Sequence, residues 1–235
     1  MIDTHCHLLP GLDDGPVDED DAVELARALV EQGVTDVICT PHYAGMFPTR
    51  HSDALQRHES LRARLDADGV PLRTTVAAEV GPGYAASQPQ EELQARSIGG
   101  RYLLVEVIPD TPLTFLELAH NRLGEMGLLP VFGHPERCRA LRKGVGVFDS
   151  LRADGALVQV VAPSLIGRWG KDAEATAWRL VDTGRADLLA SDAHSSRRRR
   201  PYLRHAADLI AERLGEQLVD ELTRRHPAAL LNGGA

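Results

Sequence analysis

Residues 1–16 of the chain read MIDTHCHLLPGLDDGP and place two histidines, His5 and His7, directly after an apolar start. In a β-strand, residues i and i+2 project to the same side, so both imidazoles are expected on one side of the end of a first strand. Two imidazoles in this arrangement make half of a metal site. The other half must come from residues later in the chain.

Beyond this segment, short apolar runs alternate with amphipathic segments along the whole sequence. The strands predicted after the first one cover residues 34–39, 73–78, 102–107, 128–132, 156–161 and 187–190. The predicted helices cover residues 17–32, 53–67 (with Ser52 as N-cap), 113–126, 147–153, 172–182, 202–213 and 216–225. Strands that alternate with helices indicate a parallel sheet. Without a linker between the units, the pattern predicts one α/β domain over residues 1–235, folded as a barrel or as an open doubly wound sheet.

In parallel α/β folds the active site lies at the carboxyl ends of the strands. Residues that can bind a metal ion occur at six of the seven predicted strand ends: His5, His7, Asp14, His42, Glu79, Glu106, His134, Asp192 and His194. Only the sixth strand, which ends in QVVAPS, offers none. A single histidine or glutamate at a strand end is usually an ordinary hydrogen-bonded residue, but repetition at one edge of the fold indicates a metal centre.

The donor types narrow the choice of metal. Glu79 and Glu106 adjoin apolar runs, and a buried carboxylate is costly unless it is paired or bound to a cation. Nine ligands are too many for one ion and suit two or three. All are nitrogen or oxygen donors, which favours Mn, Fe or Zn over a thiolate-bound structural zinc and over Mg, which prefers oxygen alone.

Composition excludes several classes of function. With 26 Lys and Arg against 34 Asp and Glu, the net charge of −8 argues against non-specific binding of nucleic acid. The run from Arg197 to Arg200 is a local exception, either a solvated surface or, beside the candidate metal centre, an anion-binding loop. No apolar run approaches the roughly 18 residues of a membrane span, and no signal peptide is expected.

The number of cysteines predicts a cytoplasmic protein, and their sequence context excludes catalysis by a cysteine nucleophile. The chain has three, Cys6, Cys39 and Cys138, and an odd number fits a reducing compartment. A cysteine-nucleophile phosphatase would need an arginine six residues after the cysteine. Those positions hold Leu12, Gly45 and Gly144 instead.

Taken together, the motifs resemble the PHP superfamily of phosphoesterases. The long signature HCHLLPGLDDGP of residues 5–16 is closer still to the bacterial manganese-dependent tyrosine-protein phosphatases of the CpsB/CapC/YwqE type. The TPH motif with the following loop Gly45-Met46-Phe47, the HPER motif of residues 134–137 and the SDAH motif of residues 191–194 match as well. The resemblance spans essentially the whole chain and implies a distorted (β/α)7 TIM-like barrel, the PHP fold, with a trinuclear metal site.

The resemblance also assigns roles to residues. One metal would take His5, His7, Glu79 and Asp192; a second would take Glu106 and His134, with Glu79 as a bridge; a third would take Asp14, His42 and His194. Arg137 matches the phosphate-binding arginine of the family, and Arg200, just before Pro201, is a candidate for a second one. His42 and His194 could also lie near the leaving group.

The implied activity is that of a metal-dependent phosphomonoester hydrolase, foremost a protein-tyrosine phosphatase, with two to three divalent ions, Mn ahead of Fe or Zn. A metal-bridging hydroxide would attack phosphorus in line while the arginines neutralise the phosphoryl oxygens. The substrate would be a phosphotyrosine protein or another phosphomonoester. A bacterial tyrosine kinase and a second copy of the chain are the protein partners that the resemblance allows.

Two departures and three alternatives remain. The acidic helix 17–32 stands where some members carry a basic assembly segment, and Cys138 follows Arg137 where an aromatic residue is common. A histidinol-phosphate phosphatase, or another small-molecule PHP phosphoesterase, would use the same metals. A metal-binding regulatory module without turnover and a nuclease are the readings from other classes.

Overall fold

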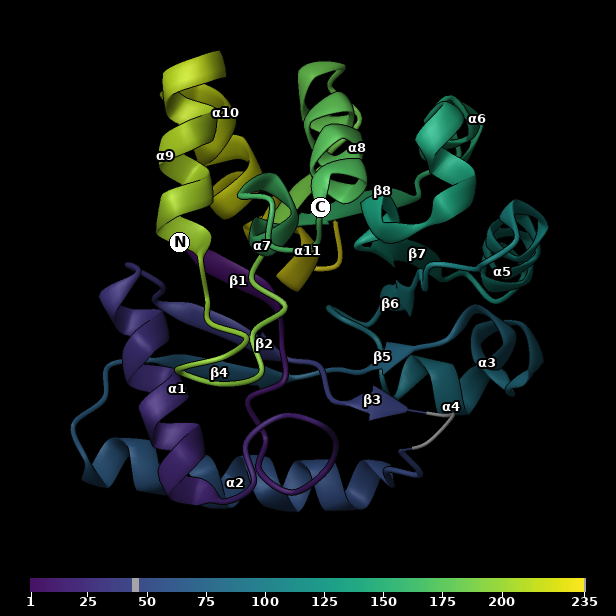
Figure 1. Cartoon of the computed structure of the whole chain (residues 1–235). Helices are drawn as coiled ribbons and strands as arrows, with labels where there is room; N and C mark the ends of the chain where they lie inside the picture. Colours follow the sequence, from purple (N-terminus) through teal and green to yellow (C-terminus); the bar gives the residue numbers. More distant parts are fainter. Residues whose placement is uncertain (44–46, 235) are drawn as a thin grey trace.

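Seven parallel strand positions form the centre of the molecule (Figure 1). The computed structural model describes residues 1–43 and 47–234. The strands are β1 (Ile2–Cys6), β2 (Asp36–Cys39), β3 (His42–Tyr43), β4 (Arg73–Val76), β5 (Glu79–Val80), β6 (Tyr102–Glu106), β7 (Leu129–Gly133), β8 (Leu157–Val161) and β9 (Leu188–Ala190). They pair in two groups, β1-β2-β4 and β3-β5-β6-β7-β8-β9, and every pair is parallel.

The nine described strands occupy seven positions because two of them, β2 and β4, are interrupted and continue as the short strands β3 and β5. The predicted strand 34–39 contains β2 and is followed, after Thr40 and Pro41, by the short β3; the predicted strand 73–78 contains β4 and is followed, after Ala77 and Ala78, by the short β5. Pro41 has no N–H to donate to a neighbouring strand, so the ladder breaks there. Each interrupted strand runs through both groups and thereby joins them.

The remaining gap, between β9 and β1, is closed by backbone hydrogen bonds just beyond the strands. The N–H of Asp192 donates to the carbonyl of His5, and that of His7 donates to the carbonyl of Ala193, both at 2.9 Å. A parallel bridge pairs Cys6 with Ala193. The predicted distorted barrel is therefore confirmed, and the open doubly wound sheet was the wrong alternative.

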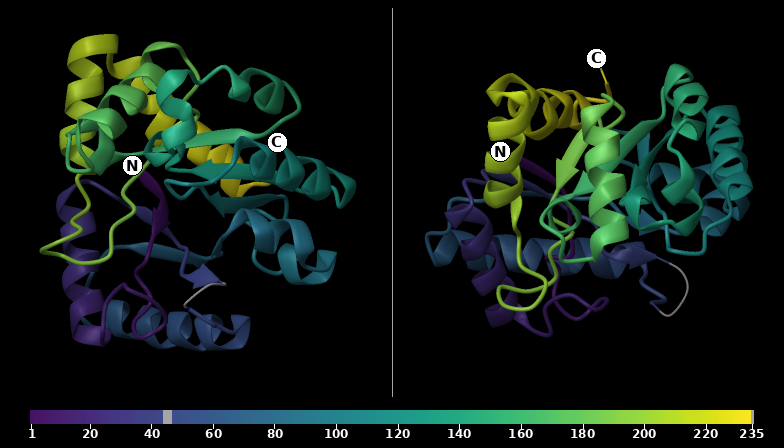
Figure 2. Two further views of the ribbon diagram at one scale, coloured as in Figure 1. Left: turned by 45° about the vertical axis from the view of Figure 1, so that its right-hand side comes forward. Right: turned by 45° about the horizontal axis from the view of Figure 1, so that its top comes forward.

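Helices surround the strands on the outside (Figures 1 and 2). They are α1 (Glu19–Glu31), α2 (His51–Ala67), α3 (Pro82–Ser87), α4 (Gln90–Gln94), α5 (Leu113–Glu125), α6 (Val147–Ala153), α7 (Ala162–Leu165), α8 (Lys171–Asp182), α9 (Leu203–Leu214), α10 (Glu216–Asp220) and α11 (His226–Leu231). Within the described residues, none is long and apolar enough to span a membrane.

Two helix predictions need correction. Helix α2 begins at His51, one residue before the predicted cap Ser52, whose hydroxyl instead donates to Asp53. The predicted helix 216–225 is α10 followed by a π-helical turn, Glu221–Arg225. Both differences concern the first residue or the last turns of a helix, and neither changes a strand that carries a candidate ligand.

Candidate metal centre

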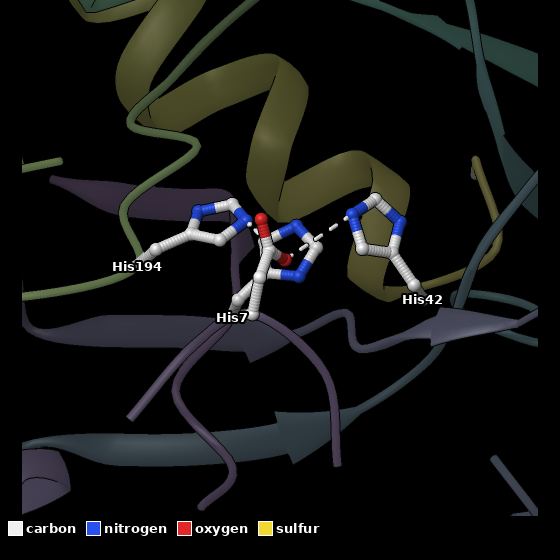
Figure 3. A group of neighbouring side chains, drawn as sticks. His7, His42 and His194 are labelled. Carbon is white, nitrogen blue, oxygen red and sulfur yellow. Dashed lines mark ion pairs between the residues drawn. The ribbon is translucent and has the colours of Figure 1, made fainter. Parts of the chain in front are cut away.

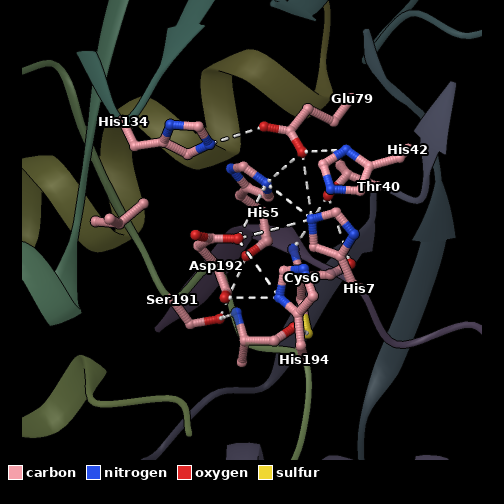
Figure 4. A network of polar contacts seen from close by, with 12 residues as sticks. His5, Cys6, His7, Thr40, His42, Glu79, His134, Ser191, Asp192 and His194 are labelled. Atoms are coloured by element: carbon pink, nitrogen blue, oxygen red, sulfur yellow. Dashed lines mark hydrogen bonds and ion pairs between the residues drawn. The ribbon is translucent and has the colours of Figure 1, made fainter. Parts of the chain in front are cut away.

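All nine predicted metal ligands lie together at the carboxyl end of the barrel, and Figures 3 and 4 show the histidines among them with Glu79 and Asp192. Their ligand atoms form four overlapping groups, within each of which all atoms lie within 4.8 Å of one another. The groups are His7, Asp14, His42 and His194; His5, His134 and Asp192; His5, His7 and Glu79; and His42, Glu79 and Glu106. The parallel barrel thus brings together residues up to 189 positions apart, from His5 to His194.

Glu79, at the start of β5, contacts four histidines of the cluster (Figure 4). Its carboxylate is buried, with Oε1 2.9 Å from Nε2 of His134 and Oε2 3.0 Å from Nδ1 of His42. Oε2 also lies 3.4 Å from Nε2 of His5 and 3.3 Å from Nε2 of His7. Burial alone would raise the pKa of Glu79, but the imidazoles, led by that of His5, hold it well below its ordinary value. One carboxylate therefore faces imidazoles on several sides, which is the arrangement of a bridging ligand.

Hydrogen bonds on the far side of three rings turn Nε2 of each toward the centre. Nδ1 of His5 contacts Oε1 of Gln159 at 2.8 Å, and Nδ1 of His7 contacts Oδ2 of Asp13 at 2.7 Å. Nδ1 of His194 donates to the backbone carbonyl of Asp192 at 3.0 Å. An acceptor on the outer nitrogen of a histidine fixes the ring for metal binding through the other nitrogen.

Asp14 lies on the solvent-facing side of the candidate metal centre. Its Oδ1 lies 3.1 Å from Nε2 of His194 and 3.6 Å from Nε2 of His42, and its side chain is 44% exposed. His42 and His194 lie on either side of His7, with the His7 and His194 rings stacked at 3.8 Å (Figure 3). These residues form a solvent-facing subsite beside the buried one around Glu79.

The pKa values of the two remaining carboxylates, Asp192 and Glu106, shift in opposite directions. Burial works to raise the pKa of Asp192, but His5 and other neighbouring cations hold it well below its ordinary value. Burial raises the pKa of Glu106, and the nearby negative charge of Glu79 raises it further. A cation beside Glu79 and Glu106 would remove this repulsion.

Two buried polar atoms that make no well-aligned hydrogen bond within the described residues show that the site fits divalent metal ions. Oε2 of Glu79 and Nε2 of His194 are buried, and although His42 Nδ1 and Asp14 Oδ1 lie within 3.0 and 3.1 Å of them, neither atom makes a well-aligned hydrogen bond with a described residue. Buried polar atoms are normally satisfied, and an unpaired one costs about 1–3 kcal/mol. Both atoms point into the cluster, where a cation ligated by imidazole and carboxylate would satisfy them.

The backbone is strained at two of the ligands. His134 and Asp192 follow β7 and β9 with φ of 38° and 50°, in the left-handed region that residues other than glycine rarely adopt. Such positions cost about 1–3 kcal/mol each and concentrate at functional sites. Here they fall on two residues that the sequence predicts as ligands.

Two arginines reach the centre, and one of them differs from the prediction. Arg137 Nη1 lies 3.8 Å from Oδ2 of Asp192, as the HPER motif implies. Arg199 contacts Asp14 at 2.8 Å and both oxygens of Asp192 at 3.1 Å, whereas Arg200 is exposed and makes no ion pair with any described residue. The loop folds back so that the carbonyl of Arg199 accepts the N–H of His194, which turns Arg199 inward. Arg199 thus takes the position expected for Arg200.

Sequence reasoning missed the residues that orient the ligands. Asp13 precedes the predicted ligand Asp14, and Gln159 lies in the strand whose end offers no ligand. Two sequence features could have identified them: Asp13 stands next to the predicted ligand Asp14 in the DDGP segment, and Gln159 is the one polar residue inside the apolar run of β8. Gly15 is required for close approach, since a Cβ there would lie 2.5 Å from the His7 carbonyl oxygen.

The loop after β3 is only partly described. The prediction for Gly45 and Met46 lies outside the described residues, while the ring of Phe47 stacks on that of His42 at 5.3 Å. Phe47 therefore covers one side of the outer subsite.

Comparisons with known proteins agree over the whole chain. The model of the family described as capsular polysaccharide synthesis, CpsB/CapC, matches residues 1–232. Tyrosine-protein phosphatase YwqE of Bacillus subtilis is 32% identical over 99% of this chain and 92% of its own length. Tyrosine-protein phosphatase CpsB of Streptococcus pneumoniae is 26% identical over 98% of both chains. A solved structure described among those of YwqE and CpsB, "unique metal-dependent tyrosine phosphatases", superposes with a TM-score of 0.89 at 30% identity, covering 100% of this chain and 96% of that one.

Proposed function

This chain belongs to the CpsB/CapC family, and we propose that it is a metal-dependent phosphatase that removes phosphate from tyrosine in proteins. The observation that carries the proposal is the joint placement of nine metal-ligand side chains and two arginines at one end of the barrel. Arginine suits a phosphoryl group because its planar fork binds two oxygens at once.

Three sets of residues would hold the metal ions. The first is His5, His7, Glu79 and Asp192; the second is Glu106 and His134 with Glu79 shared; the third is Asp14, His42 and His194. When bound, divalent ions would neutralise phosphoryl charge and lower the pKa of bound water. We propose manganese from the family resemblance, with iron and zinc as alternatives that fit the same donors.

The residues of the chain have separate tasks in this scheme. Arg137 and Arg199 bind the phosphoryl oxygens, and Phe47 covers the outer subsite beside His42. Burial, with the charge of His7, lowers the pKa of His194 to about 4, so this ring is neutral at working pH. A neutral, buried imidazole serves as a ligand rather than as a donor to the leaving group.

The shape of the site favours a protein substrate over a small one. A pocket of about 580 Å³ extends from Asp14 and His194 between α1 and the Arg197–Arg199 loop. Several of its lining side chains are exposed, including those of Val17 and Glu24. Such an open groove can take residues on either side of a phosphotyrosine, whereas histidinol phosphate would be expected in a closed cavity.

The setting of the activity is part of the proposal. The described barrel acts as one catalytic domain, and its three cysteines are free and buried, which suits the cytoplasm. Its substrate would be a phosphorylated bacterial protein, with a bacterial tyrosine kinase as the first one to test.

The test is metal-dependent turnover. The purified protein should hydrolyse p-nitrophenyl phosphate after addition of Mn, Fe or Zn, and a chelator should abolish the activity. A phosphotyrosine peptide should be a better substrate than histidinol phosphate by kcat/KM. His5→Ala and Glu79→Gln should lose activity while circular dichroism shows a folded barrel. Full activity of a metal-free His5→Ala protein would refute the proposal.

A further inference from the structure

Trp169 is the aromatic neighbour of both arginines at the metal centre. The Cζ of Arg137 lies 4.5 Å from the centroid of its ring, and that of Arg199 lies 5.7 Å away. The residue is 37% exposed and belongs to the loop between α7 and α8. Guanidinium groups at these distances are attracted to the electron-rich face of an indole.

The strand order explains why one residue can reach both arginines. Arg137 follows β7, Arg199 follows β9, and the loop that carries Trp169 follows β8. Strand β8 pairs with β7 on one side and β9 on the other. The loop after β8 therefore emerges between the two arginine loops, at the one strand end that supplies no predicted metal ligand.

Arg137 depends on this contact more than Arg199 does. Arg199 has ion pairs of 2.8 Å to Asp14 and 3.1 Å to Asp192. The closest ion pair of Arg137 with any described residue is the 3.8 Å approach to Asp192, and its side chain is 24% exposed. A long, flexible side chain with one loose ion pair needs another contact to hold its orientation, and the indole of Trp169 supplies it.

A pocket that could hold a ligand adjoins Trp169 and Arg199. A pocket of about 210 Å³ is lined by Trp169, Tyr202 and Asp192 and by the arginines Arg168, Arg198 and Arg199. An anion that entered it would meet Arg199 and lie beside the indole. Occupancy of the site should therefore change the surroundings of Trp169.

We propose that Trp169 is a positioning residue that holds Arg137 and Arg199 on the same phosphoryl group. The proposal rests on the proposed phosphatase function and deepens it, since it names the residue that aligns the two phosphate-binding groups. Its role is exerted through the arginines and not through the metal ligands.

The test uses three variants of the full chain: Trp169→Ala, Trp169→Phe and the control Trp178→Phe. Trp178 is the other tryptophan; it stacks on Arg213, which pairs with Asp182, and its indole N–H donates to the carbonyl of Leu165 at 3.1 Å, so Trp178→Phe also tests whether loss of an indole hydrogen bond to α7 alone has an effect. Trp169→Ala should raise KM and the inhibition constant of inorganic phosphate about tenfold, or about 1.4 kcal/mol. Trp169→Phe should restore most of this loss, and Trp178→Phe should match the wild type. Metal content should be equal in all variants.

A double-variant cycle separates positioning from a structural role. If Trp169 acts through Arg137, Trp169→Ala should cause a clearly smaller loss in an Arg137→Ala background than in the wild type. A loss of activity in the double variant that equals the product of the losses in the two single variants would overturn the proposal. So would an unchanged inhibition constant for phosphate in Trp169→Ala.

A second readout needs no turnover. In the Trp178→Phe protein, Trp169 is the sole tryptophan, and inorganic phosphate should change its fluorescence saturably. If the wild type hydrolyses no phosphomonoester, the proposed function fails, yet this titration still decides the role of Trp169. Phosphate binding without any change in emission refutes the inference.

Discussion

Replacing Asp13 by asparagine should weaken metal binding without unfolding the barrel. Oδ2 of Asp13 accepts from Nδ1 of His7 at 2.7 Å and from the N–H of His42 at 2.9 Å, while Oδ1 accepts from the N–H of Gly15 at 2.9 Å. An amide has one oxygen, so in either orientation its NH₂ group faces an N–H donor. Although burial opposes it, His7 holds the pKa of Asp13 at about 2, so the carboxylate is ionised at every working pH and its charge is lost as well.

The expected size follows from these contacts. An unsatisfied buried partner costs about 1–3 kcal/mol, and loss of a hydrogen-bond partner of a metal-ligating histidine typically costs about 10–100-fold in metal affinity or activity. Competition with a chelating dye measures the affinity, and thermal unfolding in chelator reports stability separately. Asp18→Asn is the matched control, because Asp18 caps the exposed start of α1 and asparagine caps equally well. Metal affinity within twofold of wild type in Asp13→Asn would refute the reasoning.

Three further outcomes are expected. Gln159→Leu removes the acceptor of His5 and should lower metal affinity about 10–100-fold, whereas Gln159→Glu, which keeps an acceptor, should lose less; dye competition compares them. Arg199→Ala should raise the KM for p-nitrophenyl phosphate at least about tenfold, as loss of a charge-assisted pair predicts, while Arg200→Ala should stay near wild type; equal effects would contradict the assignment. Despite burial, Asp13 and Glu79 raise the pKa of His7 to about 10 in the metal-free protein, so a metal ion must displace the proton of His7 when it binds. Metal affinity should therefore rise with pH by up to roughly tenfold per pH unit. Calorimetry in buffers of different ionisation enthalpy measures the proton released.

The barrel and the convergence of the candidate ligands could be predicted because both follow from local sequence patterns. Parallel strands carry continuous apolar runs, and a ligand at the end of such a run must lie at the carboxyl edge. His134 and Asp192 illustrate this, since they lie one and two residues beyond the ends of β7 and β9 and both reach the common centre. Closure between β9 and β1 could not be predicted, because it depends on backbone hydrogen bonds beyond both strands, which the periodicity of the sequence does not indicate.

The exact arginine could not be predicted from the run of four. Arg197 to Arg200 are chemically identical, and their directions depend on a turn in which the Ser195 hydroxyl accepts the N–H groups of Arg198 and Arg199. This turn returns the chain to His194 and points Arg199, rather than Arg200, at Asp14 and Asp192. Sequence identifies the loop, but only the backbone path identifies the residue.

The sixth strand shows why a search for ligands alone is incomplete. Strand β8 has no metal-binding residue at its end, yet it serves the centre at three points. Gln159 turns His5, its carbonyl accepts the N–H of the strained His134, and the loop beyond carries Trp169 to both arginines. Because a strained backbone persists only when its surroundings determine it, a strand between two ligand-bearing neighbours is best placed to supply that support. In a barrel, the strand without ligands is therefore where orienting residues should be sought.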